Sequence, residues 1–200
     1  MGLAQWIRDL KLIVKLYPDV KSIARRMFVT NSLDGIIAAL GVNVGGYSPG
    51  GDPILLASSI MGGSVAMGLI SAMLGVYLSE KAERLREYRE LEKSLASSLK
   101  SSIHWKAVNI VPLYIAFWSG LGILLFPLVI SLPYFMAAAG TLSMGNAYIA
   151  SLLAALSSMG YLGYYLARVS GENPVRGVAR VLGMGLLAIL IVKLLRLAIA

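Results

Sequence analysis

One carboxylate lies inside a long apolar stretch of this chain. Residues 27–47 (MFVTNSLDGIIAALGVNVGGY) are long enough to cross a bilayer as a helix, and Asp34 is their only charged residue. A charge near the bilayer centre costs about 2.5–3.5 kcal/mol on insertion scales, so an ion, a proton or a fixed partner must offset it. The residue type and its position therefore indicate an intramembrane cation or proton site.

Several polar residues are expected at the depth of Asp34. This residue lies seven positions after Met27, about 10 Å into the span, and Asn31 is one turn away on the same helix face. Counting the same depth along the returning second apolar run reaches Ser71 and Met73. We therefore predict that Asp34, Asn31, Ser71 and Met73 surround one polar point, where a proton and a metal ion compete for the carboxylate. Gly35 would let a partner helix or a ligand approach closely.

A second acidic group follows the second apolar run. Glu80, Glu83, Glu87 and Glu90 recur at i, i+3, i+7 and i+10, which places them on one side of a helix. Hard divalent cations prefer such oxygen ligands. The alternative, which we rank first, is a solvated helix face on which these glutamates pair with neighbouring arginines.

The composition is that of an integral membrane protein. The 200 residues are 58% hydrophobic and 14% charged, whereas soluble domains are about one quarter charged. The absence of cysteine excludes disulfides and thiolate metal sites. The net charge of +8 is concentrated in blocks beside the apolar runs, which is typical of juxtamembrane residues and argues against nucleic-acid binding. No HExxH or GxSxG motif and no second intramembrane acid or base are present, so we expect no enzyme.

The apolar runs predict an all-α integral membrane protein with five transmembrane helices. Residues 107–167 contain no charge, so they must hold two spans and a connection, with Pro112 and Pro127 inside the first of these two helices. We expect connections at 131–145 and 168–176, where turn-forming residues gather. The expected spans are about 27–47, 54–79, 107–130, 146–167 and 178–200.

One polar region precedes the five-span membrane domain of residues 27–200, and a second lies within it. Residues 1–26 combine an amphipathic helix over 3–17 with a basic collar, and Pro18 ends that helix. The helix either lies in the membrane interface or packs on a neighbouring helix of the same chain. Residues 80–106 are expected to extend the second span as a cytoplasmic helical segment.

A stripe of small residues marks the second span. Ser64, Gly68, Ser71 and Gly75 follow at i, i+4, i+7 and i+11, so a regular α-helix would place them on one face. Small residues let helix backbones approach closely in a membrane. We therefore expect this face, together with the Gly41 and Gly45 pair of the first span, to form helix contacts.

The basic residues predict an orientation. Of the eighteen Lys and Arg, six precede the first span, seven lie in 80–106, three lie in 168–180 and two lie near the C-terminus. The positive-inside rule then places the N-terminus in the cytoplasm and, with five spans, the C-terminus outside. We expect the protein in a prokaryotic cell membrane.

These segments together resemble the vacuolar iron transporter family. Residues 25–35 (RRMFVTNSLDG) resemble its basic opening followed by Asp-Gly, and residues 66–83 look like its second span with a following Lys-x-Glu. Pro127, the Leu-Pro pair at 132–133 and residues 170–176 before the last helix are similar too, so the resemblance covers about 25–200.

The resemblance implies a homodimeric exchanger that moves ferrous iron or manganese out of the cytosol against protons. The metal would be a transported substrate, with no permanently bound cofactor, and Asp34 matches the essential aspartate of the family. Two positions depart from the pattern: Ser64 stands where the family has a second-span glutamate, and Ala72 replaces a methionine, with Met73 adjacent.

The polar segment after the second span is short for this family. Some members carry a large cytoplasmic metal-binding domain there, whereas this chain has only residues 80–106, as a short prokaryotic-type member would. Glu80, Glu83 and Glu87 would then stand in for that domain. An alternative function also stays open: a homodimeric interaction or structural protein without transport, in which Asp34 pairs across the dimer axis. The absence of a second-span carboxylate favours this alternative.

Overall fold

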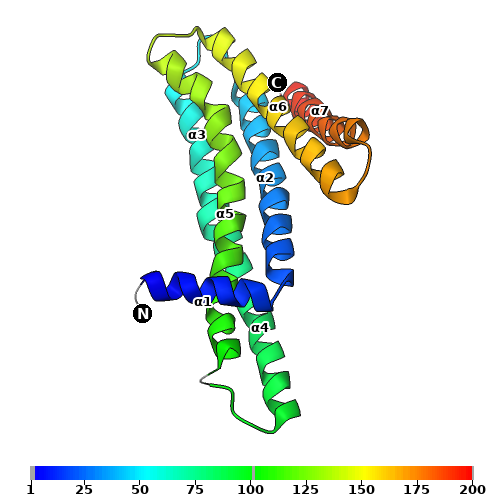
Figure 1. Cartoon of the computed structure of the whole chain (residues 1–200). Helices are drawn as coiled ribbons and strands as arrows, with labels where there is room; N and C mark the ends of the chain where they lie inside the picture. The colour runs from blue at the N-terminus through cyan, green and yellow to red at the C-terminus, as the bar shows by residue number, and fades with distance from the viewer. Residues whose placement is uncertain (1–2, 101, 200) are drawn as a thin grey trace.

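The computed structural model describes residues 3–100 and 102–199, and every regular element in them is a helix. Five helices are long and apolar enough to cross a membrane, as the sequence predicts (Figure 1). The second of these is continuous through α3, η1 and α4. The elements are α1 (Leu3–Leu16), α2 (Asp19–Gly46), α3 (Pro53–Val65), the π-helical η1 (Ala66–Met73), α4 (Leu74–Leu95), α5 (Ile103–Ala138), α6 (Met144–Ser170) and α7 (Pro174–Ile199).

The helix ends follow local sequence signals. Pro18 separates α1 from α2 as predicted, and the Asp52 side chain accepts a hydrogen bond from the Ile54 amide (2.8 Å) at the start of α3. The Ser143 hydroxyl accepts from the Asn146 amide at the start of α6. Gly171, with φ of 72°, ends α6 in the left-handed conformation that glycine adopts readily.

Two predicted connections are shorter in the structure. We expected turns over 131–145 and 168–176, but α5 continues to Ala138 and α6 to Ser170, which leaves 139–143 and 171–173. The expectation was wrong for residues 131–138, whose turn-forming residues, Pro133 among them, lie inside α5. In a bilayer an open peptide group costs more than the single hydrogen bond that a proline removes, so the helix continues through it.

The π-helical segment changes which residues of the second span face the bundle. Ser64 and Gly68 are buried, whereas Ser71 and Gly75 are exposed, so the four residues do not share one face as predicted. A π-helix bonds residue i to i+5 and therefore takes up more residues per turn than an α-helix. The segment rotates α4 relative to α3, and the small-residue stripe is divided between two sides.

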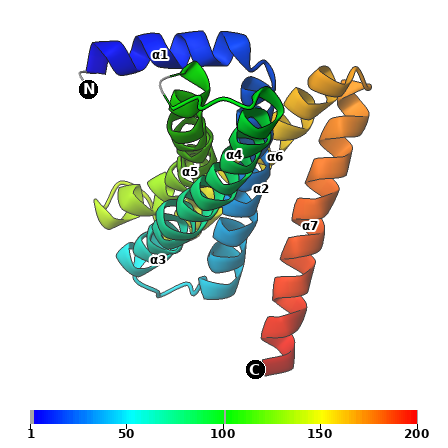
Figure 2. The same ribbon diagram turned by 90° about the horizontal axis from the view of Figure 1, so that it is seen from below.

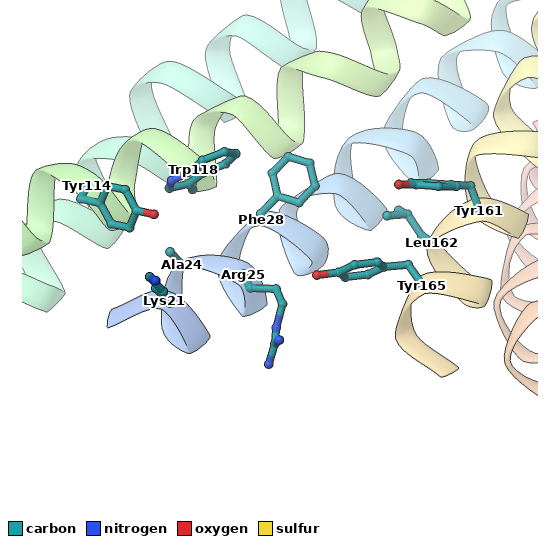
Figure 3. Close-up of a pocket in the computed structure, with 9 residues that line it drawn as sticks. All are labelled: Lys21, Ala24, Arg25, Phe28, Tyr114, Trp118, Tyr161, Leu162 and Tyr165. Atoms are coloured by element: carbon teal, nitrogen blue, oxygen red, sulfur yellow. The ribbon is translucent and has the colours of Figure 1, made fainter. Parts of the chain in front are cut away.

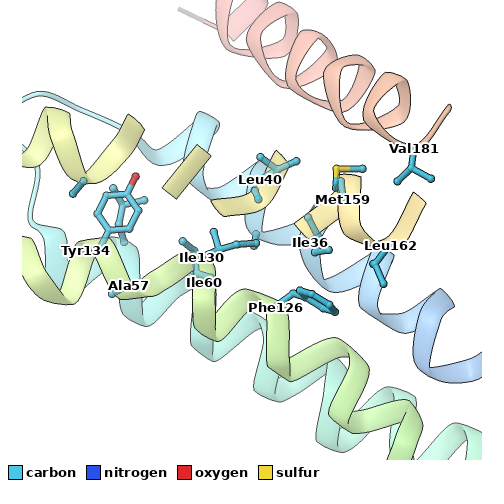
Figure 4. Packing of buried hydrophobic residues seen from close by; sticks show 14 residues of the cluster. Ile36, Leu40, Ala57, Ile60, Phe126, Ile130, Tyr134, Met159, Leu162 and Val181 are labelled. Atoms are coloured by element: carbon cyan, nitrogen blue, oxygen red, sulfur yellow. The ribbon is translucent and has the colours of Figure 1, made fainter. Parts of the chain in front are cut away.

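Helix α5 forms the centre of the bundle and packs against every other element except α7. The main core lies between α2, α3, α5 and α6, as Figure 4 shows, and includes the fully buried Ile36, Ile60 and Ile130. Helix α7 packs on α6 and α2 at the edge of the bundle and leaves most of its surface exposed (Figure 2). The Arg196 guanidinium donates to the Tyr47 carbonyl (3.2 Å), so α2 and α7 end at the same end of the molecule.

Helix α1 runs across the other helices rather than along them (Figures 1 and 2). It packs on α5, with Ile13 fully buried and the Lys106 ammonium 2.9 Å from the Asp9 carboxylate. Packing against another helix of the same chain, one of the two predicted roles of α1, is therefore confirmed. Its place in the membrane interface stays a prediction.

Candidate functional site

Asp34 lies on the outer surface of α2. Its side chain is exposed, while Ser32, Gly35 and Ile36 on the other side of the helix are buried. Within residues 3–100 and 102–199, no basic side chain lies within 4 Å of the Asp34 carboxylate and no side chain or backbone group hydrogen-bonds to it. A single chain therefore leaves this carboxylate without a partner at the level of its apolar span.

The position of Asp34 is fixed by the contact directly beside it. A Cβ atom on Gly35 would lie 2.7 Å from the Ile123 carbonyl oxygen of α5, so the predicted close approach of a helix at Gly35 is confirmed. That carbonyl has no helical partner because Pro127, four residues later, has no N–H. Helix α2 thus packs directly against the backbone of α5 at this carbonyl.

Asn31 links three helices. Its amide nitrogen donates to the Met27 carbonyl (2.9 Å) and to the Ser119 hydroxyl (2.7 Å), and the Ser119 hydroxyl reaches the Ala72 carbonyl over 3.5 Å. The chain of polar groups therefore runs from α2 through α5 to the π-helical η1. Asn31 is therefore connected through Ser119 to the backbone beside Ser71 and Met73, while the common polar point with Asp34 stays a prediction.

Ser119 was not predicted. The signal in the sequence is a serine beside Gly120 within a long apolar helix, but nothing in its spacing indicates Asn31 as its partner. Gly120 leaves the room that Met73 fills, so Met73 packs at the same junction. The thioether of Met73 is therefore a packing group there, close to the polar chain of Asn31 and Ser119.

The two serines predicted for the site occupy different environments. Ser64 is buried, and its hydroxyl donates to the Ile60 carbonyl of the same helix (2.8 Å). Ser71 is exposed on η1. Ser64 therefore contributes to helix packing, and only Ser71 presents its hydroxyl at the surface.

Two of the four glutamates of the acidic stripe form ion pairs on α4. Glu83 pairs with Arg86, and the Glu87 carboxylate lies 3.0 Å from Arg84, which confirms the helical ion pairs for these two glutamates. The buried Arg84 also reaches Asp19 at the start of α2 (2.5 Å), a bridge that the sequence did not predict. This bridge holds the part of α4 beyond the apolar run against the rest of the bundle.

Glu80 differs from the rest of the stripe. It is half-buried, and this burial raises the pKa of its carboxyl, while the positive charges of Arg84 and Arg26 act in the opposite direction. Glu80 is also one helical turn before Arg84, which pairs with Asp19 at the start of α2. Asp34 lies eight residues after Arg26, about 12 Å further along the helix.

The described part of the chain does not gather a metal site by itself. No group of three or more His, Asp or Glu side chains within residues 3–100 and 102–199 is close enough to hold one metal ion. The polar groups at the depth of Asp34 are instead amide, hydroxyl and carbonyl groups, which suit a hard or borderline divalent cation only together with further carboxylates.

Comparison with known proteins finds an uncharacterized relative. No family model matches the chain. An uncharacterized protein of Methanocaldococcus jannaschii, MJ0645, is 28% identical to it over 169 residues, which cover 82% of this chain and 85% of the archaeal protein. The similarity extends over most of both chains, and the name of the relative states no activity.

Proposed function

We propose that this protein transports divalent transition metals, Fe²⁺ or Mn²⁺, out of the cytosol in exchange for protons, with Asp34 as the intramembrane ion site. The observation that carries this proposal is the exposed Asp34 carboxylate, which lies in an apolar span without a partner in the described chain. The resemblance to the vacuolar iron transporter family supports the choice of ions and the exchange for protons.

A second copy of the chain would complete the site. One carboxylate is too few for a divalent cation. Calcium takes six to eight oxygen ligands, and other divalent cations also need several ligands. Asp34, Ala38 and Gly41 follow at i, i+4 and i+7, and a Cβ atom on Gly41 would meet nothing within 4 Å. This outward face combines the carboxylate with small residues that allow close helix contact, so we propose a homodimer that brings two Asp34 side chains together.

Neighbouring groups support a path to this site. Asn31 uses its amide nitrogen in two hydrogen bonds, which leaves its Oδ1 atom as an acceptor one turn from Asp34. Glu80 lies nearer the start of α2, on the side where we expect the cytoplasm. Its raised pKa makes it a suitable proton carrier between water and the span.

A second candidate function is a homodimeric membrane protein that binds a partner or supports a structure without transport. Two observations favour it: Glu83 and Glu87 are paired with arginines, and the described residues gather no set of three metal ligands. In this case the two Asp34 side chains would share a proton across the dimer and serve assembly.

Flux measurements separate the two functions. Purified protein in liposomes is supplied with Fe²⁺, Mn²⁺ or Co²⁺, with and without a pH gradient, beside the variants Asp34→Asn and Asp52→Asn. The second variant makes the same chemical change outside the span, where asparagine caps a helix as well as aspartate does. We expect Asp34→Asn to abolish flux while the dimer persists, and Asp52→Asn to retain it. Absence of flux for every ion, with Asp34→Asn falling apart to monomers, would favour the second function.

A further inference from the structure

A cavity lined by aromatic rings opens between α2, α5 and α6. Its volume is about 310 Å³, and rings from all three helices form its walls (Figure 3). Phe28 comes from α2 and meets Trp118 of α5 edge to face, with ring centroids 6.0 Å apart. Tyr161 and Tyr165 extend toward them from α6. The cavity therefore offers apolar ring faces together with phenol hydroxyl groups.

The charges around this cavity are all positive. Lys21 and Arg25 line it from α2, both are exposed, and no acidic residue lines it. Among the described residues, neither cation has a carboxylate within 4 Å. Lysine, arginine and tyrosine hydroxyl groups together match a phosphate group, because each supplies hydrogen-bond donors and two supply charge.

The cavity lies at the level where the apolar segments end. Lys21 and Arg25 precede the apolar run of α2, and Arg168 follows Tyr165 by three residues on α6. Tryptophan and tyrosine concentrate at this level of a membrane, where lipid phosphates also lie. Phe28, one turn beyond Arg25, extends the cavity toward the hydrocarbon side. A free phosphate ion would use the cations but not these apolar walls, whereas a phospholipid would use both.

We propose that this cavity binds the headgroup of an anionic phospholipid. Its phosphate lies between Lys21 and Arg25, and its glycerol and first acyl carbons pack against Phe28 and Trp118. Basic pockets between membrane helices bind anionic lipid headgroups in this way. A zwitterionic lipid carries the same phosphate, but its own positive amine is repelled by Lys21 and Arg25. The cavity should therefore bind anionic lipids more tightly than zwitterionic ones. The site does not involve Asp34 and is independent of metal transport.

Trp118 provides a direct reporter of occupancy. The chain has three tryptophans, so the full-length Trp6→Phe/Trp105→Phe protein fluoresces from Trp118 alone. This protein is reconstituted in phosphatidylcholine vesicles that contain a minor fraction of brominated phosphatidylglycerol or brominated phosphatidylcholine, and bromine quenching is measured. We expect half-maximal quenching at a roughly thirtyfold lower fraction of the anionic lipid, because each cation near the surface contributes about fivefold in affinity.

Matched variants identify the residues responsible. In the same background, Lys21→Ser/Arg25→Ser should remove the preference for anionic lipid. Lys11→Ser/Lys15→Ser removes two exposed charges from α1 at the same end of the molecule and should retain it. Unfolding temperatures show whether each variant is folded, and a single Lys21→Gln change replaces the first pair if that pair does not fold. Equal quenching by both lipids in the parent protein, or a preference that survives the loss of Lys21 and Arg25, would overturn the proposal.

A second arm separates the lipid from a free phosphate ion. Inorganic phosphate is added at constant ionic strength to the vesicles with brominated phosphatidylglycerol. Quenching that persists supports the lipid as the ligand. Recovery of Trp118 fluorescence would show that phosphate alone occupies the site, and the lipid proposal would then be wrong.

Discussion

Helices α2 and α5 approach each other closely beside Asp34, and the substitution Gly35→Ala tests this contact. The added methyl carbon would lie 2.7 Å from the Ile123 carbonyl oxygen and 3.2 Å from the Ile123 Cα, both backbone atoms that cannot rotate away. Helices α2 and α5 must therefore separate by several tenths of an ångström along a well-packed contact. Overpacking of this kind costs about 1–3 kcal/mol. Alanine is the better helix former by about 1 kcal/mol, so the net loss is about 0–2 kcal/mol relative to wild type.

The control Gly183→Ala isolates the steric effect. Gly183 lies inside α7, outside the proposed dimer face of α2, and a Cβ atom there would meet nothing within 4 Å, so this variant should gain about 1 kcal/mol from helix propensity alone. The two variants should therefore differ by about 1–3 kcal/mol, which corresponds to roughly 2–4 °C of unfolding temperature per kcal/mol at this chain length. Thermal unfolding in detergent, monitored by tryptophan fluorescence, measures the difference. Equal unfolding temperatures for Gly35→Ala and Gly183→Ala would refute the close contact of α2 with α5.

Two further predictions concern hydrogen bonds away from this contact. A double-mutant cycle of Asn31→Ala and Ser119→Ala, measured by unfolding, tests the hydrogen bond between these residues. Its coupling energy should be about 0.6 kcal/mol and at most about 1.7 kcal/mol, as is typical of hydrogen bonds between membrane helices. Zero coupling would show that the bond is absent. The hydroxyl of Tyr88 and, secondarily, the amide of Leu99 donate to Glu92 and lower the pKa of its carboxyl. The stability that they contribute is therefore present above the usual glutamate pKa and lost as pH falls through the lower pKa of the folded state. Hydrogen exchange of the Leu99 amide, corrected for its intrinsic rate, should accelerate in the wild-type protein when Glu92 becomes protonated. Equal protection of this amide before and after acidification would contradict its hydrogen bond to Glu92.

The number of spanning helices could be predicted because it depends on hydropathy and length alone. The ends of α5 and α6 could not be predicted. Pro133 and Gly171 are both turn-forming residues, yet α5 continues through Pro133 whereas α6 ends at Gly171. A glycine in the left-handed conformation ends a helix, whereas a proline inside an apolar segment only removes one hydrogen bond. Sequence alone does not distinguish these two cases when both residues lie near an expected boundary.

The candidate site was predictable only in part. Counting along two helices predicted residues 71–73 near the Asp34 level, and the structure connects Asn31, one turn from Asp34, to the Ala72 carbonyl through Ser119. Its partner Ser119 lies 88 residues away, and no local pattern specifies such a pair. The sequence also does not predict which way the Asp34 side chain points. In a membrane both faces of α2 are apolar, so periodicity does not identify the buried face. For the glutamates, local spacing to Arg84 and Arg86 sufficed, because these ion pairs form within one helix.

The π-helical turn in the second span sets the rotational phase of everything that follows it. Deleting one residue between 66 and 73 would restore regular α-helical bonding and turn the whole of α4 by about 100° around its axis. Arg84 would then face away from Asp19, and the ion pair that holds α4 to the start of α2 would open. The π-helical turn within the apolar part of the second span therefore determines how α4 packs against α2 several turns later.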